Sequence, residues 1–194
     1  MFKYHLITTK FFLAASLLFG LPAIAQDVGV KIVGRWYLPV QKQDKGDFTF
    51  FSQGVQEYFP NGSMSIQLQS VSRLKEDSSA ISCDTVVDYT WSTVGDTLYQ
   101  KMMGVNTSLG YYVKNGKEVR DSSDLEHAKK ICDIELNFRK KYIFKTSSFK
   151  IKKIDGAENV YSSINSEGKE VIEKDLRTPY GLEKFYVKKG DFFN

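Results

Sequence analysis

Side chains that could perform catalysis are few in this sequence and far apart. The chain has two cysteines, Cys83 and Cys132, and two histidines, His5 and His127. It contains no G-x-S-x-G nucleophile turn, no H-E-x-x-H zinc motif and no phosphate-binding P-loop. Its carboxylates form no pair with a catalytic context. We therefore expect no catalytic residues, no metal site and no cofactor, and we predict that the protein is not an enzyme.

The first 25 residues have the pattern of a secretory signal peptide. A basic start is followed by an apolar run over 11–24 and by Ala23-Ile24-Ala25, in which small residues stand two positions apart. This pattern predicts cleavage after Ala25. Neither this short run nor any later segment is long enough to span a membrane. Removing the first 25 of 194 residues leaves 169, which suits a single domain, 26–194, that is periplasmic or secreted.

The two cysteines lie in the exported part of the chain. In an oxidising compartment, two cysteines in one chain favour a disulfide between Cys83 and Cys132. Such a bridge would close a loop of about 50 residues and contribute about 4 kcal/mol to the free energy of unfolding. Two separate buried thiols are the alternative.

Loss of the signal removes two lysines and no acids, so the formal net charge falls from +4 to +2. A chain this close to neutral is not expected to bind nucleic acid. Basic residues are concentrated between 139 and 153, where no acid interrupts them. We call five of them the basic patch: Arg139, Lys140, Lys141, Lys150 and Lys152. The patch either binds an anionic partner, such as an acidic protein, or is a solvated strand face whose lysines deter edge pairing.

Short segments of alternating polarity dominate the exported part. In 63–70, Met64, Ile66 and Leu68 alternate with polar residues, which is typical of a half-buried strand. Turn signals separate such segments at Asn61-Gly62, Gly95-Asp96, Asn115-Gly116, Thr146-Ser147-Ser148, Asp155-Gly156 and Glu167-Gly168. This rhythm predicts an antiparallel meander of eight to ten strands. Closure into a barrel would remove the exposed edges, and a sandwich is the competing architecture.

One segment departs from the strand rhythm. Ser123-Asp124-Leu125-Glu126 has the pattern of a capping box, and apolar residues follow at helical spacing. We predict one short helix from about Asp124 to Asp133, with Cys132 able to attach it to the sheet. His127 lies on this helix, and we interpret it as a surface residue.

Three motifs together carry a resemblance to a known family. Gly34-Arg35-Trp36 resembles the Gly-x-Trp signature that opens the first strand of lipocalins. Tyr58-Phe59-Pro60-Asn61-Gly62 is similar to a hairpin of small bacterial lipocalin-like proteins, with Asn61 where the family often has Asp. Tyr89-Thr90-Trp91, followed by Gly95-Asp96-Thr97-Leu98, is similar to a second hairpin of theirs. The motifs cover about residues 30–103.

The resemblance implies an all-β chain whose antiparallel meander closes into a lipocalin-like barrel with one short helix. It implies that Trp36 plugs one end and that an arginine packs against it, and either Arg177 or Arg139 could serve. It also implies a small apolar or amphipathic ligand in the interior. Candidate ligand-binding residues are the aromatic ones: Trp36, Tyr58, Tyr89, Trp91, Tyr111 and Phe144. The same side chains could instead form a fully packed core.

Two functions follow from these patterns. The first is an exported lipocalin-like protein that binds a small apolar or amphipathic ligand. The second is a periplasmic protein-binding module, of the inhibitor or immunity type, that uses the basic patch and the helix.

Overall fold

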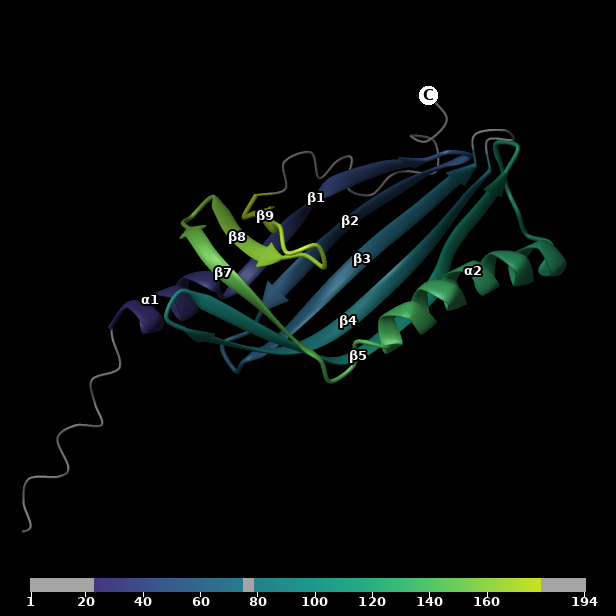
Figure 1. The fold of residues 1–194 in the computed structure, drawn as a ribbon. Helices are drawn as coiled ribbons and strands as arrows, with labels where there is room; N and C mark the ends of the chain where they lie inside the picture. The colour runs from purple at the N-terminus through teal and green to yellow at the C-terminus, as the bar shows by residue number, and fades with distance from the viewer. Residues whose placement is uncertain (1–22, 75–78, 179–194) are drawn as a thin grey trace, which may run out of the picture.

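The computed structural model describes residues 23–74 and 79–178, and an antiparallel β-barrel forms its centre (Figure 1). Two helices and nine strands follow one another in this order: α1 (Ala23–Ile32), β1 (Gly34–Lys45), β2 (Phe48–Tyr58), β3 (Ser63–Leu74), β4 (Ala80–Val94), β5 (Thr97–Lys114), β6 (Lys117–Glu118), α2 (Ser122–Lys140), β7 (Thr146–Ile154), β8 (Glu158–Ile164) and β9 (Glu170–Leu176).

Eight of these strands close the barrel. The strands β1 to β5 pair in sequence order, each with its neighbour. The other edge of β5 pairs with β7, which pairs with β8, and β8 pairs with β9. The last strand, β9, returns to pair antiparallel with β1, where Tyr37 lies opposite Leu176. The barrel predicted from the sequence is thus confirmed, and the sandwich is not observed. The two-residue strand β6 only extends the end of β5.

The predicted turns at Asn-Gly and Gly-Asp pairs are confirmed. Gly62 and Gly95 adopt positive φ angles of 80° and 60° between their strands, a conformation that glycine adopts without strain. Asn115 and Gly116 both have positive φ, as a tight hairpin turn requires. The break predicted at Thr146-Ser147-Ser148 is wrong, because these residues begin β7 and pair with β5.

The helix α2 is longer than predicted and begins differently. Asp121, not Ser123, caps it, since the Asp121 carboxylate accepts a hydrogen bond of 2.8 Å from the backbone amide of Ser123. Its last residue is Lys140 rather than Asp133. The predicted disulfide between Cys132 and Cys83 of β4 is present and holds α2 against β4 and β5 (Figure 1).

Only a small part of the predicted signal peptide lies within the described residues. Residues 1–22, which carry most of the predicted signal peptide, lie outside the described residues, and α1 begins at Ala23. No helix in the described part is long and apolar enough to cross a membrane. The disulfide is consistent with an oxidising compartment.

Candidate functional site: the interior of the barrel

Trp36 closes one end of the barrel. Its side chain is completely buried, and the indole nitrogen donates a hydrogen bond of 2.6 Å to the carbonyl of Ile32 at the end of α1. Ile32, Tyr58, Met64 and Leu98 are packed into the same cluster, each at most 2% exposed. This end of the barrel is therefore filled by side chains, as the Gly-x-Trp resemblance implied.

Arg177 is the arginine that packs against this tryptophan. Its guanidinium carbon lies 3.8 Å from the centroid of the Trp36 ring. One terminal nitrogen donates hydrogen bonds of 2.7 Å to the carbonyls of Lys31 and Val33. Gly34, with φ of 109°, leaves room for it, because a Cβ there would stand 2.5 Å from the other terminal nitrogen. Arg177, directly after β9, thus ties this strand to α1 and β1.

A cavity of about 690 Å³ occupies the barrel beyond this plug. Apolar and aromatic side chains from seven strands form much of its wall: Leu38, Phe50, Ile66, Leu68, Tyr89, Phe149, Tyr161, Val171 and Ile172. Gly54 of β2 has no side chain between these leucines. A Cβ added there would lie 2.8 Å from a methyl group of Leu38 and 2.6 Å from a methyl group of Leu68, which is too close. Glycine at this position therefore lets the two leucines pack over β2.

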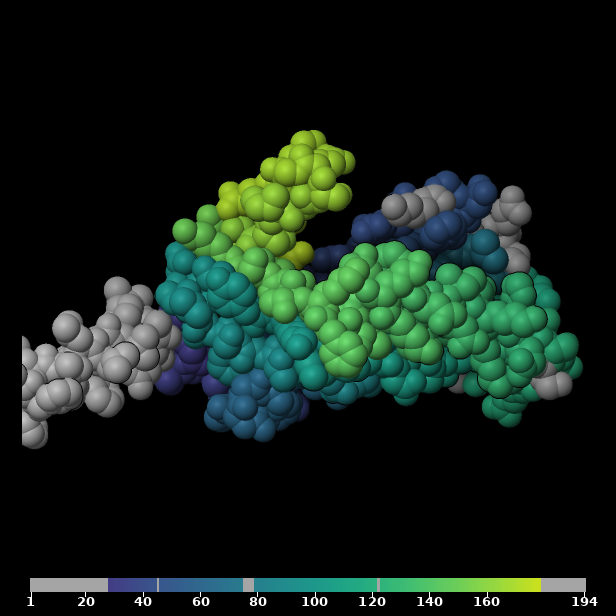
Figure 2. Space-filling model, turned by 60° about the horizontal axis from the view of Figure 1, so that its bottom comes forward, coloured from purple at the N-terminus to yellow at the C-terminus, as the bar shows by residue number. Residues whose placement is uncertain are grey.

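The cavity opens between β1 and β9. These strands are paired at Tyr37 and Leu176, and β1 bulges between Leu38 and Gln41. Pro39 lies in this bulge and lines the cavity; as a proline it has no N–H to donate to a neighbouring strand. Figure 2 shows a hollow that separates the β8–β9 region from β1. The closing strands thus separate above the plug and leave an entrance.

Polar side chains form the floor of the cavity, next to the plug. Gln100 donates a hydrogen bond of 2.6 Å to the hydroxyl of Tyr58. The Gln56 amide donates to one oxygen of the Asp175 carboxylate, and the Tyr161 hydroxyl donates to the other at 3.3 Å. All five side chains are at most 8% exposed. We call these residues the polar floor.

Asp175 is the acidic member of the polar floor. Its side chain is 1% exposed, and burial raises its pKa to about 7, with the nearby charge of Glu173 adding to the rise. The hydrogen bonds from Tyr161 and Gln56 oppose this rise in pKa. Burial also raises the pKa of Tyr58 and Tyr161, so both hydroxyls remain protonated donors.

The C-terminal part of α2 lines the opposite side of the cavity. Glu135 accepts hydrogen bonds of 3.0 Å from Ser70 of β3 and from Arg139, one helical turn further along α2. Arg139 lines the cavity, and its charge lowers the pKa of Tyr89, which burial raises. Ser70 and Cys83 lie on the inner face of the sheet, away from the plug along their strands. The helix α2 therefore covers the barrel from inside at the end opposite Trp36, which we call the wide end.

The predicted ligand-binding residues fall into three groups. Tyr89 lines the cavity, and Tyr58 belongs to its polar floor. Trp36 and Trp91 pack at the closed end, where Trp91 lies edge-on to Tyr58. Tyr111 packs instead with Val71 and Ala80, and Phe144 is 66% exposed between α2 and β7. Reasoning from aromatic residues missed Gln56, Gln100 and Asp175; polar side chains at inward positions of strands were the signal.

The residues of the basic patch lie in three different places in the fold. Arg139 faces the cavity, whereas Lys140 and Lys141 end α2. Lys150 and Lys152 are exposed on β7 and form ion pairs with Asp96 at 3.2 Å and Glu170 at 2.7 Å. The sequence run therefore does not form one continuous unpaired surface.

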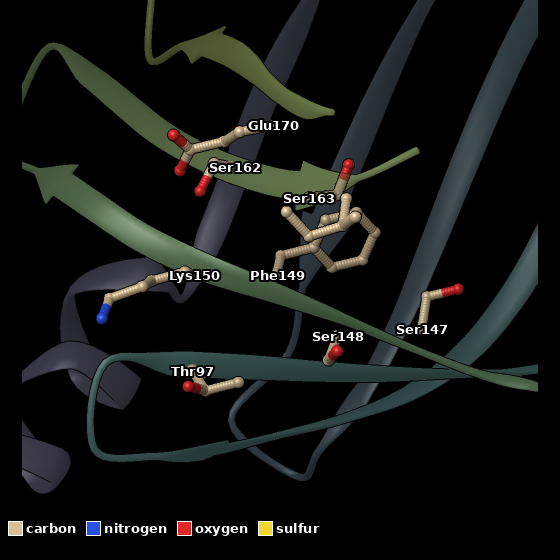
Figure 3. Close-up of a pocket in the computed structure, with 9 residues that line it drawn as sticks. Thr97, Ser147, Ser148, Phe149, Lys150, Ser162, Ser163 and Glu170 are labelled. Atoms are coloured by element: carbon tan, nitrogen blue, oxygen red, sulfur yellow. The ribbon is translucent and has the colours of Figure 1, made fainter. Parts of the chain in front are cut away.

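A second hollow of about 560 Å³ lies outside, against β5, β7 and β8. Figure 3 shows hydroxyl-bearing side chains around it, with Ser147 and Ser148 on β7 and Ser162 on β8 beside Glu170. Its cation, Lys150, is paired with Asp96. Across the described ranges, no cluster of three or more histidine, cysteine or acidic side chains could hold a metal ion. The interior cavity is thus the better candidate for a ligand.

No protein-family model matches this chain, and no curated protein sequence matches it. The family resemblance therefore rests on the motifs of the sequence, on the eight-stranded barrel and on the Trp36–Arg177 contact.

Proposed function

We propose that the protein binds one small amphipathic molecule inside the barrel, as a binding protein rather than an enzyme. The observation that carries this proposal is the cavity of about 690 Å³, which has a largely apolar wall, a polar floor and an entrance between β1 and β9. Its size is within the range of small-molecule sites, and the combination of apolar walls with a few polar groups is typical of them. The apolar part of a ligand would contact Ile66 and Leu68, and its polar group would contact the floor.

Titration with the neutral apolar fluorophore N-phenyl-1-naphthylamine tests this proposal. We expect saturable binding of one molecule per chain. Ile66→Trp would fill the cavity from β3 and abolish the binding. Val86→Trp is the matched control, because Val86 is 42% exposed on the outer face and pairs with Gln67, the neighbour of Ile66. Absence of saturable binding, or equal binding by a folded Ile66→Trp variant, would contradict the proposal.

A second candidate function is binding of an acidic partner protein at the outer face of α2. Ile134 and Phe138, one helical turn apart, are 68% and 57% exposed. Lys140 and Lys141 follow them on the same helix end, so an apolar stripe lies beside positive charge. Monomeric proteins seldom expose adjoining large apolar side chains without a binding role, which favours a partner here.

Site-specific photocrosslinking in the exporting cell tests the second candidate. A photoreactive residue in place of Phe138 should give one discrete adduct, whereas the same residue at Ile164, which is 69% exposed on β8, should not. Reversal of charge at Lys140 and Lys141 should remove the adduct. An adduct that is equally strong from both positions, or that survives charge reversal, would contradict a specific acidic partner.

A further inference from the structure

The polar floor holds a carboxylate that no cation of the described residues neutralises. Within 23–74 and 79–178, no lysine or arginine forms an ion pair with Asp175, and its two partners, Gln56 and Tyr161, are neutral donors. An ionised carboxylate offers about four acceptor sites, so two hydrogen bonds leave it able to accept more. Buried carboxylates are normally paired, which makes this one unusual.

A side chain next to the polar floor also lacks hydrogen-bond partners among the described residues. Asn159 of β8 lies directly opposite Asp175 of β9, so both side chains stand on the same face of the sheet. Asn159 is completely buried, and neither polar atom of its amide has a hydrogen-bond partner among the described residues. A buried amide without partners costs free energy, so the surroundings of Asp175 are suited to a further polar group.

The charges around the cavity add to the same preference. Glu173 lines the cavity on β9 two residues before Asp175 and faces the same side. The two cations that line the cavity are already paired: Arg139 with Glu135 at 2.9 Å, and Lys174 with Glu158. Among the described residues that line the cavity, the unneutralised charge is therefore negative. Aromatic rings of Tyr89, Phe149 and Tyr161 complete the wall, and ring faces attract cations.

We propose that the ligand carries a protonated amine, which binds the Asp175 carboxylate while the apolar part of the molecule fills the cavity. This inference rests on the proposed function, since it names the chemical class of the ligand of the same cavity. An ammonium group supplies three donors, which suits the acceptor sites that Asp175 leaves open. It also compensates a buried charge that has no counter-ion within 23–74 and 79–178.

The inference predicts a dependence of affinity on pH. Asp175, with a pKa of about 7 in the empty protein, is faced by Tyr58 from β2, by Tyr161 from β8 and by Glu173 on its own strand. The two tyrosines stay neutral, so the negative charge that the polar floor gains as pH rises is that of Asp175. We expect the affinity for an amine to fall about tenfold from pH 8 to pH 6, as Asp175 takes up its proton.

Three probes of equal chain length and different head group test the inference. Octylamine, octanol and octanoate would each be titrated against bound N-phenyl-1-naphthylamine at pH 8. We expect octylamine to displace the fluorophore at a concentration at least tenfold lower than octanol, and octanoate to be the weakest. Asp175→Asn should remove the advantage of octylamine and leave octanol unchanged. Asp88→Asn, an exposed carboxylate on β4, is the matched control and should change nothing.

The outcomes separate the two proposals. If the fluorophore binds but octylamine has no advantage over octanol, or Asp175→Asn retains that advantage, the amine inference is overturned and the ligand-binding function stands. If the fluorophore does not bind at all, both fall. If Asp175→Asn does not fold, the head-group order and the pH dependence of the unaltered protein decide.

Discussion

The two ends of this barrel are built from the same strands but are packed in opposite ways. At the closed end, Trp36 and its neighbours are almost completely buried, and Arg177 bonds the end of α1 to the sheet. At the wide end, β1 and β9 separate, and α2 is held over the interior by a disulfide and by Glu135. The comparison indicates that the closed end provides stability, whereas the wide end leaves space for a ligand.

Loss of the plug should have the largest effect. We expect Trp36→Ala to lower the free energy of unfolding by about 3–5 kcal/mol, because a buried indole leaves a cavity and Arg177 loses the ring beneath it. Urea denaturation measures the change. Phe144→Ala, at an exposed aromatic between α2 and β7, is the control and should cost much less. Equal losses in both variants would show that Trp36 stabilises the fold no more than an exposed ring does.

The pH dependence of stability should reveal the polar floor. The pKa of Asp175 is raised from 3.8 to about 7 on folding, so the folded state binds the proton more tightly. The contribution of Asp175 to the free energy of unfolding is therefore greatest below about pH 4. It falls by ~4 kcal/mol in total as pH rises to about 7, and then levels off. The stability difference between Asp175→Asn and the unaltered protein should follow this curve. A difference that is constant from pH 4 to 8 would show that Asp175 is ionised throughout.

Removal of the disulfide should loosen the wide end. We expect replacement of Cys83 and Cys132 by serine to cost about 2–4 kcal/mol, because the bridge constrains the unfolded chain across a separation of 49 residues. Hydrogen exchange should increase in α2 and remain slow around Trp36. An equal increase at both ends would contradict the assignment of the disulfide to the wide end.

A smaller effect is expected from Gly34→Ala at the entry to β1. The alanine would have to adopt a positive φ, and its Cβ would displace the Arg177 guanidinium, at a cost of about 1–3 kcal/mol. Gly46→Ala, also at positive φ but with no atom within 4 Å of the added Cβ, isolates the backbone part of the cost. Thermal denaturation of the two variants compares them. If Gly34→Ala cost no more than Gly46→Ala, the Arg177 contact would contribute nothing.

Local patterns were enough to predict the hairpins and the plug. Asn61-Gly62 and Gly95-Asp96 specify turns through backbone conformation alone, and Gly34-Arg35-Trp36 indicates the closed end. The choice between Arg177 and Arg139 could not be made, because it depends on β9, the last strand, pairing with β1, the first, at Tyr37 and Leu176. The end of α2 was missed because its last turns expose Ile134 and Phe138, which breaks the amphipathic pattern.

The cavity was harder to predict for a related reason. On β9 the inward residues are Val171, Glu173 and Asp175, so the strand does not alternate between apolar and polar faces as a packed strand does. The polar residues face inward because the interior there is a cavity with a hydrogen-bonded floor. Whether space remains between inward side chains depends on all the strands together, and a single strand does not reveal it.

The most direct test of the account is where a bound apolar chain lies. In the complex with octanol, nuclear Overhauser contacts should join the methylene protons of the alcohol to the methyl groups of Ile66 and Leu68. No contact should reach Val86, which is exposed on the outer face of β4. Contacts to Val86 without contacts to Ile66 and Leu68 would contradict binding inside the barrel.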